Sequence, residues 1–172
     1  DGVIDDNDKY AVGHGLAPRL TYGFSLGAEW NGFDFSCLFQ GNAGLQVYWQ
    51  DKFYMGYINY GDVINKEIAE GAWREGRTNA TYPRLLIGLN TLNAQPSDFW
   101  VQNKSYLRLK NVQIGYKIPK KLLQKLDISQ LRLYTSLENM LTFTSYKGID
   151  PEISGTTYPT MKQITVGVNV VF

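Results

Sequence analysis

Strict alternation of apolar and polar residues constrains the fold of this chain more than any other feature. Every second residue near the end of the sequence is apolar: Ile164, Val166, Val168, Val170 and Phe172. A period of two places alternate side chains on opposite faces of a β-strand. The pattern recurs over residues 19–30, 33–40, 105–118 and 130–143. The sequence therefore predicts five strands, the last of them within 161–172.

The predicted connections differ greatly in length. Asn31-Gly32 is a type I′ turn signal and predicts a tight hairpin. Pro119 is placed to occupy the first position of one or two helical turns within 119–126. The other connections, 48–98 and 145–160, are long, and such loops commonly carry function.

One strand breaks the alternation. Leu107 and Leu109 have the opposite parity to Val112 and Ile114. Either a β-bulge near Lys110 restores the apolar face, or the start of this strand projects beyond the apolar layer.

The polar faces of these strands carry mostly Gly, Ser, Thr, Gln and Asn. Charged residues make up 19% of the chain, below the roughly 25% of ordinary soluble domains. Uncharged polar side chains facing a lumen, with apolar side chains facing outward, match an outer-membrane β-barrel. Aromatic residues at strand ends, such as Trp30 and Tyr116, match its girdles. An apolar face buried as a soluble core is the alternative.

Five strands cannot close a barrel, since known single-chain barrels have at least about eight. We therefore expect residues 1–172 to be the carboxyl-terminal part of an all-β, antiparallel transmembrane barrel. Two alternatives stay open. A small autonomous barrel with an adhesive or structural role needs three more strands within 48–98, and a soluble β-sandwich carbohydrate-binding module needs two apolar faces packed together.

Several motifs occur in an order that resembles the SusC/RagA family of TonB-linked outer-membrane receptors. Residues 105–119 (SYLRLKNVQIGYKIP) resemble the family's penultimate barrel segment. The segments LENMLTFT (137–144), YKGIDPE (146–152) and GVNVVF (167–172) follow in the family's order. Residues 31–41, 79–84 and 97–100 resemble its upstream segments, so the resemblance covers nearly the whole chain.

The resemblance implies a barrel of about 22 strands in the outer membrane of a Gram-negative bacterium. It implies an amino-terminal plug, which these residues do not include, and energy from TonB acting through that missing part. It also implies a SusD-like surface lipoprotein as partner and import of oligosaccharides or peptides.

The first residues match the second half of a calcium loop. With Asp1-Gly2 at loop positions 5 and 6, the ligands would be Asp1, Val3, Asp5 and Asp8. Hard oxygen ligands suit Ca²⁺, and a solvated acidic turn is the alternative.

Aromatic residues gather in the long loop, and their rings offer platforms for sugar faces or peptide side chains. The substrate-binding candidates are Trp49, Tyr54, Tyr57, Tyr60 and Trp73. Packing within the loop or against a partner is the alternative for each.

Other functions find little support. A net charge of +1 gives no footprint for nucleic acid, and one Cys37 and one His14 offer no metal cluster, redox cofactor or catalytic triad. Asp150 and Glu152 have no partner base in the sequence pattern, so we do not expect an enzyme. Phe172, a terminal aromatic after alternating valines, resembles the assembly signal of outer-membrane barrels.

Overall fold

The structure of the protein is a computed structural model. It describes residues 2, 5–13, 15, 17–48, 57–58, 63–87, 96–124, 127–153 and 157–172, with the backbone alone at 57–58. The chain forms two compact units. The first comprises Asp1–Gly13 and Val47–Gln102, and the second comprises His14–Gln46 and Asn103–Phe172.

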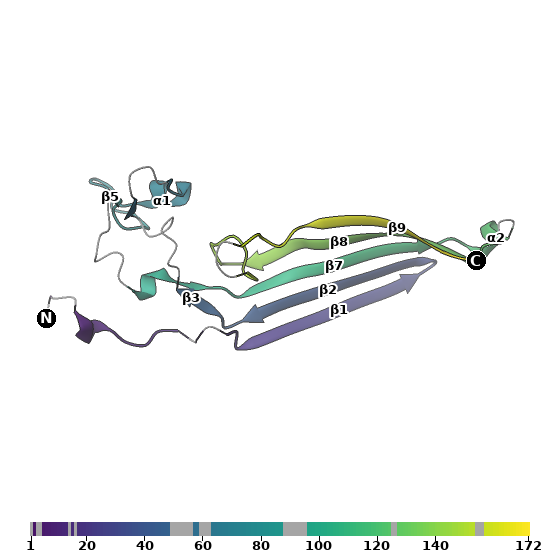
Figure 1. The fold of residues 1–172 in the computed structure, drawn as a ribbon, viewed down its shortest axis with the longest axis horizontal. Helices are drawn as coiled ribbons and strands as arrows, with labels where there is room; N and C mark the ends of the chain where they lie inside the picture. The colour runs from purple at the N-terminus through teal and green to yellow at the C-terminus, as the bar shows by residue number, and fades with distance from the viewer. Residues whose placement is uncertain are drawn as a thin grey trace. The chain divides into compact units, whose positions relative to one another are not determined.

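The second unit is one antiparallel sheet of five long strands (Figure 1). Its members, in spatial order, are β1 (Leu20–Trp30), β2 (Phe33–Ala43), β7 (Tyr106–Lys117), β8 (Gln130–Thr144) and β9 (Gln163–Val171). All five predicted strands are confirmed, with ends shifted by at most a few residues. The sheet has two open edges, so the described residues do not close a barrel by themselves.

The two short connections lie at one end of the sheet, together with the end of β9 (Figure 1). Asn31 and Gly32 have φ angles of 49° and 86°, as a type I′ turn requires. Between β7 and β8 lies α2 (Lys120–Leu123). Pro119 is its N-cap and not its first helical residue, so that detail of the prediction was wrong. The long connections leave from the opposite end of the sheet.

A β-bulge explains the broken alternation in β7. Cys37 pairs with Val112 and Phe39 pairs with Leu109, so β7 contains one more residue than β2 over this stretch. The extra residue lies around Lys110, and it returns Leu107 and Leu109 to the apolar face. The neighbouring β8 also shifts register there, where Asn139 adopts a positive φ of 54°. Of the two alternatives, the bulge is confirmed.

The apolar face is continuous across all five strands and largely exposed. One row joins Leu26, Cys37, Val112, Leu137 and Ile164 through successive strand pairs. Ile164 and Val166 are 66% and 79% exposed. A β-sandwich would bury such a face against a second sheet, and the described residues contain no second sheet of comparable length.

The remaining elements are short: η1 (Asp6–Asp8), β3 (Gln46–Tyr48), β4 (Tyr57–Ile58), α1 (Lys66–Gly71), β5 (Leu86–Ile87), η2 (Asp98–Trp100) and β6 (Val101–Asn103). Strands β3 and β6 pair, as do β4 and β5. The three further spanning strands needed for a small autonomous barrel are absent from the described part of 48–98. Among the described residues, no helix is long and apolar enough to cross a membrane.

Candidate functional site

The side-chain hydrogen bonds and ion pairs of the sheet lie mainly on its polar face, opposite the exposed apolar face. The middle rows of the polar face consist of small or uncharged side chains, as predicted. One such row joins Gly27, Ser36, Gln113, Ser136 and Thr165. Charged residues concentrate instead toward the two ends of the strands.

At the end with short connections, two ion pairs each reach across an intervening strand. Arg132 of β8 donates from Nε to Asp34 Oδ1 of β2 at 2.8 Å, passing over Gly115 of β7. A Cβ atom on Gly115 would lie 2.5 Å from both partners. Glycine is therefore needed here because the ion pair fills the space of a side chain.

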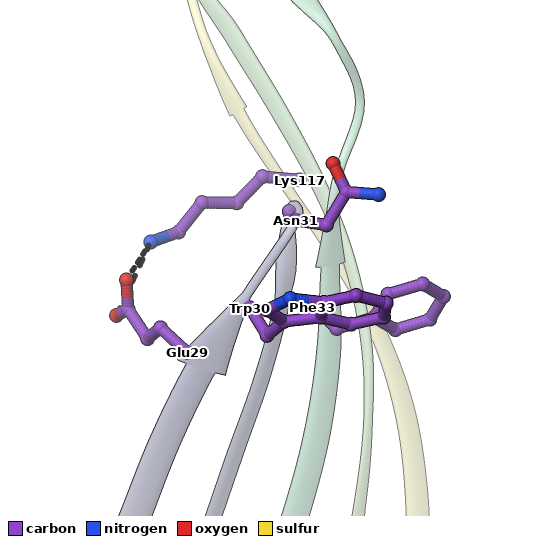
Figure 2. Close-up of a pocket in the computed structure, with 6 residues that line it drawn as sticks. Glu29, Trp30, Asn31, Phe33 and Lys117 are labelled. Atoms are coloured by element: carbon purple, nitrogen blue, oxygen red, sulfur yellow. Dashed lines mark hydrogen bonds and ion pairs between the residues drawn. The ribbon is translucent and has the colours of Figure 1, made fainter.

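The second ion pair joins Glu29 of β1 to Lys117 of β7, with 3.4 Å between Nζ and Oε2. Figure 2 shows this pair on one side of the hairpin end and the rings of Trp30 and Phe33 on the other. Trp30 is 77% exposed and Phe33 is 52% exposed. Charge and aromatic surface are thus separated by the thickness of the sheet at this end.

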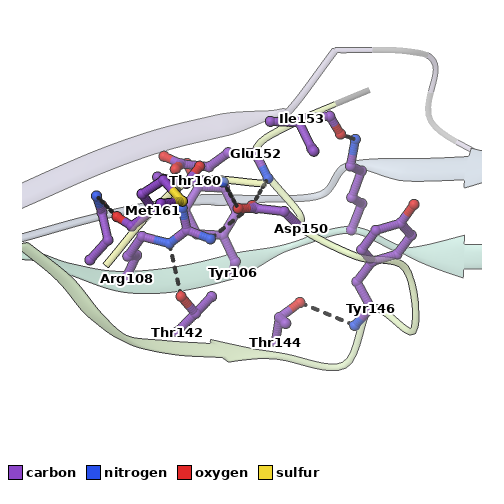
Figure 3. A network of polar contacts seen from close by, with 12 residues as sticks. Tyr106, Arg108, Thr142, Thr144, Tyr146, Asp150, Glu152, Ile153, Thr160 and Met161 are labelled. Carbon is purple, nitrogen blue, oxygen red and sulfur yellow. Dashed lines mark hydrogen bonds and ion pairs between the residues drawn. The ribbon is translucent and has the colours of Figure 1, made fainter. Parts of the chain in front are cut away.

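At the opposite end, Arg108 of β7 is the centre of a buried polar network (Figure 3). Its Nη2 lies 2.8 Å from Asp150 Oδ1, and both side chains are only 4% exposed. Its Nη1 pairs with Glu152, and its Nε donates to Thr142 Oγ1 at 2.8 Å. Asp150 and Glu152, in the segment between β8 and β9 (residues 145–162), are thereby held against the polar face. We call this segment the β8–β9 loop.

Further contacts complete the network. Lys110 Nζ and Tyr106 Oη each donate to Glu152 at 2.8 Å. The backbone amides of Glu152 and Thr160 donate to Asp150 at 2.8 and 3.0 Å. The two acids therefore do have basic partners, which the sequence pattern did not reveal. These contacts neutralise and orient both acids.

These surroundings also shift the pKa values of Asp150 and Glu152. Burial of Asp150 on its own raises the pKa, but hydrogen bonds from the Glu152 amide, Arg108 and Thr160 outweigh it and hold the pKa below its ordinary value. For Glu152 the same competition, with Lys110 and Tyr106 as donors, also lowers the pKa. Both acids are therefore carboxylates at neutral pH.

The predicted aromatic platforms lie in the first unit, and the structure describes only one of their side chains. Trp49, Tyr54 and Tyr60 fall outside the described residues, and the side chain of Tyr57, in β4, does too. Trp73 follows α1 and is 46% exposed, with the Arg84 guanidinium 6.0 Å from the centre of its ring. Substrate binding by these residues stays a prediction.

The predicted calcium ligands are only half described, since Asp1 and Val3 lie outside the described residues. Asp5 caps η1: its Oδ1 accepts from the Asn7 amide at 2.8 Å, and its own amide donates to Asp8 Oδ2 at 2.9 Å. These contacts form a capping box. The described residues contain no group of three or more candidate ligands close enough to hold a metal ion. Ca²⁺ binding stays a prediction.

Phe172 follows the end of β9 and is 85% exposed. Its role as an assembly signal is a prediction that the geometry leaves untested. Cys37 lies on the apolar face of β2 between Leu26 and Val112, and it is only 6% exposed.

Comparison with known proteins identifies the sheet. No protein-family model matches the chain. TonB-dependent receptor P3 of Formosa agariphila is 30% identical over 99% of the chain. A solved structure of the RagAB peptide importer in the open-open state superposes on all of the chain with a TM-score of 0.74 at 29% identity. The chain matches part of a SusC/RagA-like TonB-dependent receptor.

Other comparisons agree. The TonB-dependent receptor SusC of Bacteroides thetaiotaomicron is 26% identical over 99% of the chain. The chain spans 18% of receptor P3, 17% of SusC and 19% of the matched RagAB chain. It is similar to part of a SusC/RagA receptor, and its sheet matches part of the receptor barrel. These relatives are named as receptors and importers and not as enzymes.

The Arg108 network is the main feature that sequence reasoning missed. Its members lie 42 and 44 residues apart, and no local spacing connects them. One signal was present: Arg108 is a charged residue between Leu107 and Leu109, within a predicted strand. Once the bulge is known, this residue lies on the polar face, opposite Thr142.

Proposed function

We propose that the receptor containing this chain lies in the outer membrane of a Gram-negative bacterium and imports oligosaccharides or peptides. Import is driven by TonB through a part of the receptor outside these residues. A SusD-like lipoprotein at the cell surface is the partner. The 172 residues form part of the receptor barrel, and the plug is a separate part of the protein.

The exposed apolar face carries this proposal. Five adjacent strands present one unbroken apolar surface, and their other face is polar. Lipid on one side and a polar lumen on the other account for both surfaces. The peptide importer RagAB and the receptor SusC, which resemble the chain along its length, support the class of transport.

The strand directions support one orientation of the sheet in the membrane. If β9 ends at the periplasm, both short connections are periplasmic and both long connections are extracellular, as is usual in such barrels. The aromatic candidates of the long loop, including Trp73, would then meet substrate outside the membrane. Replacing Trp49 and Trp73 by Ala should weaken ligand binding, and unchanged affinity would remove both from consideration.

Uptake by cells tests the function. A strain lacking the full-length receptor should lose uptake of labelled oligopeptides or oligosaccharides, and a strain lacking TonB should lose it to the same extent. A strain lacking the SusD-like lipoprotein should show reduced uptake. Normal uptake of a broad panel of both ligand classes in the receptor deletion would reject the proposal.

Two smaller proposals concern single sites. Phe172 acts as an assembly signal, so its deletion from the full-length receptor should reduce the amount of folded barrel. Restoring the residues that precede Asp1 should allow Ca²⁺ binding at Asp1, Val3, Asp5 and Asp8. Calorimetry without a Ca²⁺-dependent heat would contradict the second proposal.

A further inference from the structure

A hollow of about 690 Å³ opens beside Trp73 in the first unit. Ala69 and Ala72 of the α1 region contribute small side chains to its lining. The other lining residues are Trp73, Arg74, Glu75, Arg84 and Leu85. It thus combines an aromatic ring, two guanidinium groups and one carboxylate.

The backbone around this hollow is firmly held. Asn65 caps α1 by accepting from the Glu67 amide at 2.9 Å, and Ile68 of this helix is fully buried. The Trp73 amide donates to the Tyr82 carbonyl at 3.0 Å. The hydroxyl of Tyr82 donates to Glu67 at 2.8 Å, so the two segments that carry the lining residues are tied together. A pre-ordered site loses little conformational entropy when it binds.

The charges of the hollow are available to a ligand. Arg74 and Arg84 form no ion pair with any residue in the part of the chain that the structure describes. By contrast, the nearby Arg77 guanidinium is bound to the Glu70 carbonyl. Guanidinium groups bind carboxylates through two parallel hydrogen bonds, and an adjacent aromatic ring suits a flat or apolar group.

We propose that this hollow binds a carboxylate of an imported oligopeptide, with Arg74 and Arg84 as anion-binding residues and Trp73 as an apolar platform. This inference rests on the proposed import function and narrows its substrate to peptides, which the hollow would recognise through a carboxylate. Peptides always have carboxylates to offer at a free carboxyl terminus, and the matched RagAB structures are of a peptide importer. Glu75 at the same hollow opposes the binding of acids and limits its strength.

Binding to the full-length purified receptor tests the proposal by calorimetry. One probe is a heptapeptide with three Glu residues and a free carboxyl terminus, and the other has Gln at those positions and an amidated terminus. The acidic peptide should bind about tenfold more tightly, the effect of one exposed charge-assisted contact. Arg74→Gln and Arg84→Gln should each reduce this preference, and the double variant should abolish it.

Two matched variants separate a local contact from general charge. Glu75→Gln should increase the preference for the acidic peptide. Lys66→Gln removes a positive charge from the exposed side of α1, where Lys66 pairs with Glu70 outside the hollow, and should change nothing. Unchanged mobility of the folded barrel in electrophoresis without heating shows that each variant is assembled.

The outcomes that overturn the inference are distinct from failure of import itself. Equal affinity of the wild-type receptor for both peptides, or a preference that survives in the double variant, overturns it while peptide uptake by cells still stands. Arginine-dependent binding of tetragalacturonate without binding of either peptide overturns the assignment to peptides. If cells also take up no peptide, the peptide branch of the proposed function fails with it.

Discussion

Replacement of Arg108 by Leu is the strongest test of how the β8–β9 loop is held. The substitution removes the hydrogen bonds to Asp150, Glu152 and Thr142 and leaves a carboxylate that is only 4% exposed without its cation. Removing one partner of a buried pair typically costs about 3–5 kcal/mol. The barrel wall has its own hydrogen-bonded ladder, so we expect the loop to open and the sheet to remain.

Hydrogen exchange detects this opening. The amides of Glu152 and Thr160 are protected because they donate to Asp150. If the free energy of opening falls by about 3 kcal/mol, exchange of these amides should speed up by about two orders of magnitude. Mass spectrometry of peptides from 145–162 of the full-length receptor measures this effect, and peptides from β1 provide an internal reference.

Two further variants sharpen the interpretation. Lys110→Met removes a cation that is 24% exposed and leaves the Arg108–Asp150 pair intact, so its effect should be about 1 kcal/mol or less. Arg108→Leu combined with Asp150→Asn should cost less than the two single changes added together, because no buried charge is left unpaired. Unchanged exchange of the Glu152 and Thr160 amides in Arg108→Leu would refute the idea that Arg108 holds the loop.

Three other predictions follow from the same geometry. The depressed pKa values of Asp150 and Glu152 contribute stability above their ordinary pKa values, which are 3.8 and 4.5, and this stability is lost as pH falls through the folded-state values. After correction for the intrinsic exchange rate, amide exchange in the β8–β9 loop should therefore stay constant between pH 7 and about 5. It should become faster below about pH 4, where these acids are protonated. Gly115→Ala should separate Asp34 from Arg132 and lower the free energy of unfolding by about 1–3 kcal/mol, seen as a lower melting temperature. Gly27→Ala should be tolerated, because its Cβ would lie 3.6 Å from the Phe35 carbonyl. Equal melting of the two glycine variants would contradict this reasoning. Val166→Arg, on the exposed apolar face, should destabilise the barrel by about 2–4 kcal/mol near the membrane midplane and so lower the amount of assembled receptor. Thr165→Arg, on the polar face, should leave that amount unchanged. Similar membrane yields of both arginine variants would argue against a lipid-facing surface.

The strands and their facing could be predicted because both depend on local alternation. Each strand is long enough to repeat the pattern several times, and Asn31-Gly32 specifies its own turn through two positive φ angles. The bulge near Lys110 is also visible in the sequence, as a change of parity between Leu109 and Val112. These features are encoded within a few residues of the positions where they occur.

The polar network could not be predicted because its partners meet only after the chain has folded. Asp150 and Glu152 are distant in sequence from Arg108, and the register of β7 against β8 brings them together. The hollow beside Trp73 is a similar case. Trp73 was a candidate on composition alone, but its relation to Arg84 depends on the bridge between Ala72 and Tyr82.

The glycines of the polar face change how its composition should be understood. A lumen face rich in Gly suggests an open, featureless wall, but Gly115 lies beneath the Asp34–Arg132 pair, and a Cβ on Gly167 would meet the ring of Tyr134. Arg132 in turn lies 5.1 Å from the centre of that ring. The small residues thus make room for large side chains from neighbouring strands. Because these contacts cross from β2 to β9, they fix the shape of the wall and add order that backbone pairing alone would not supply.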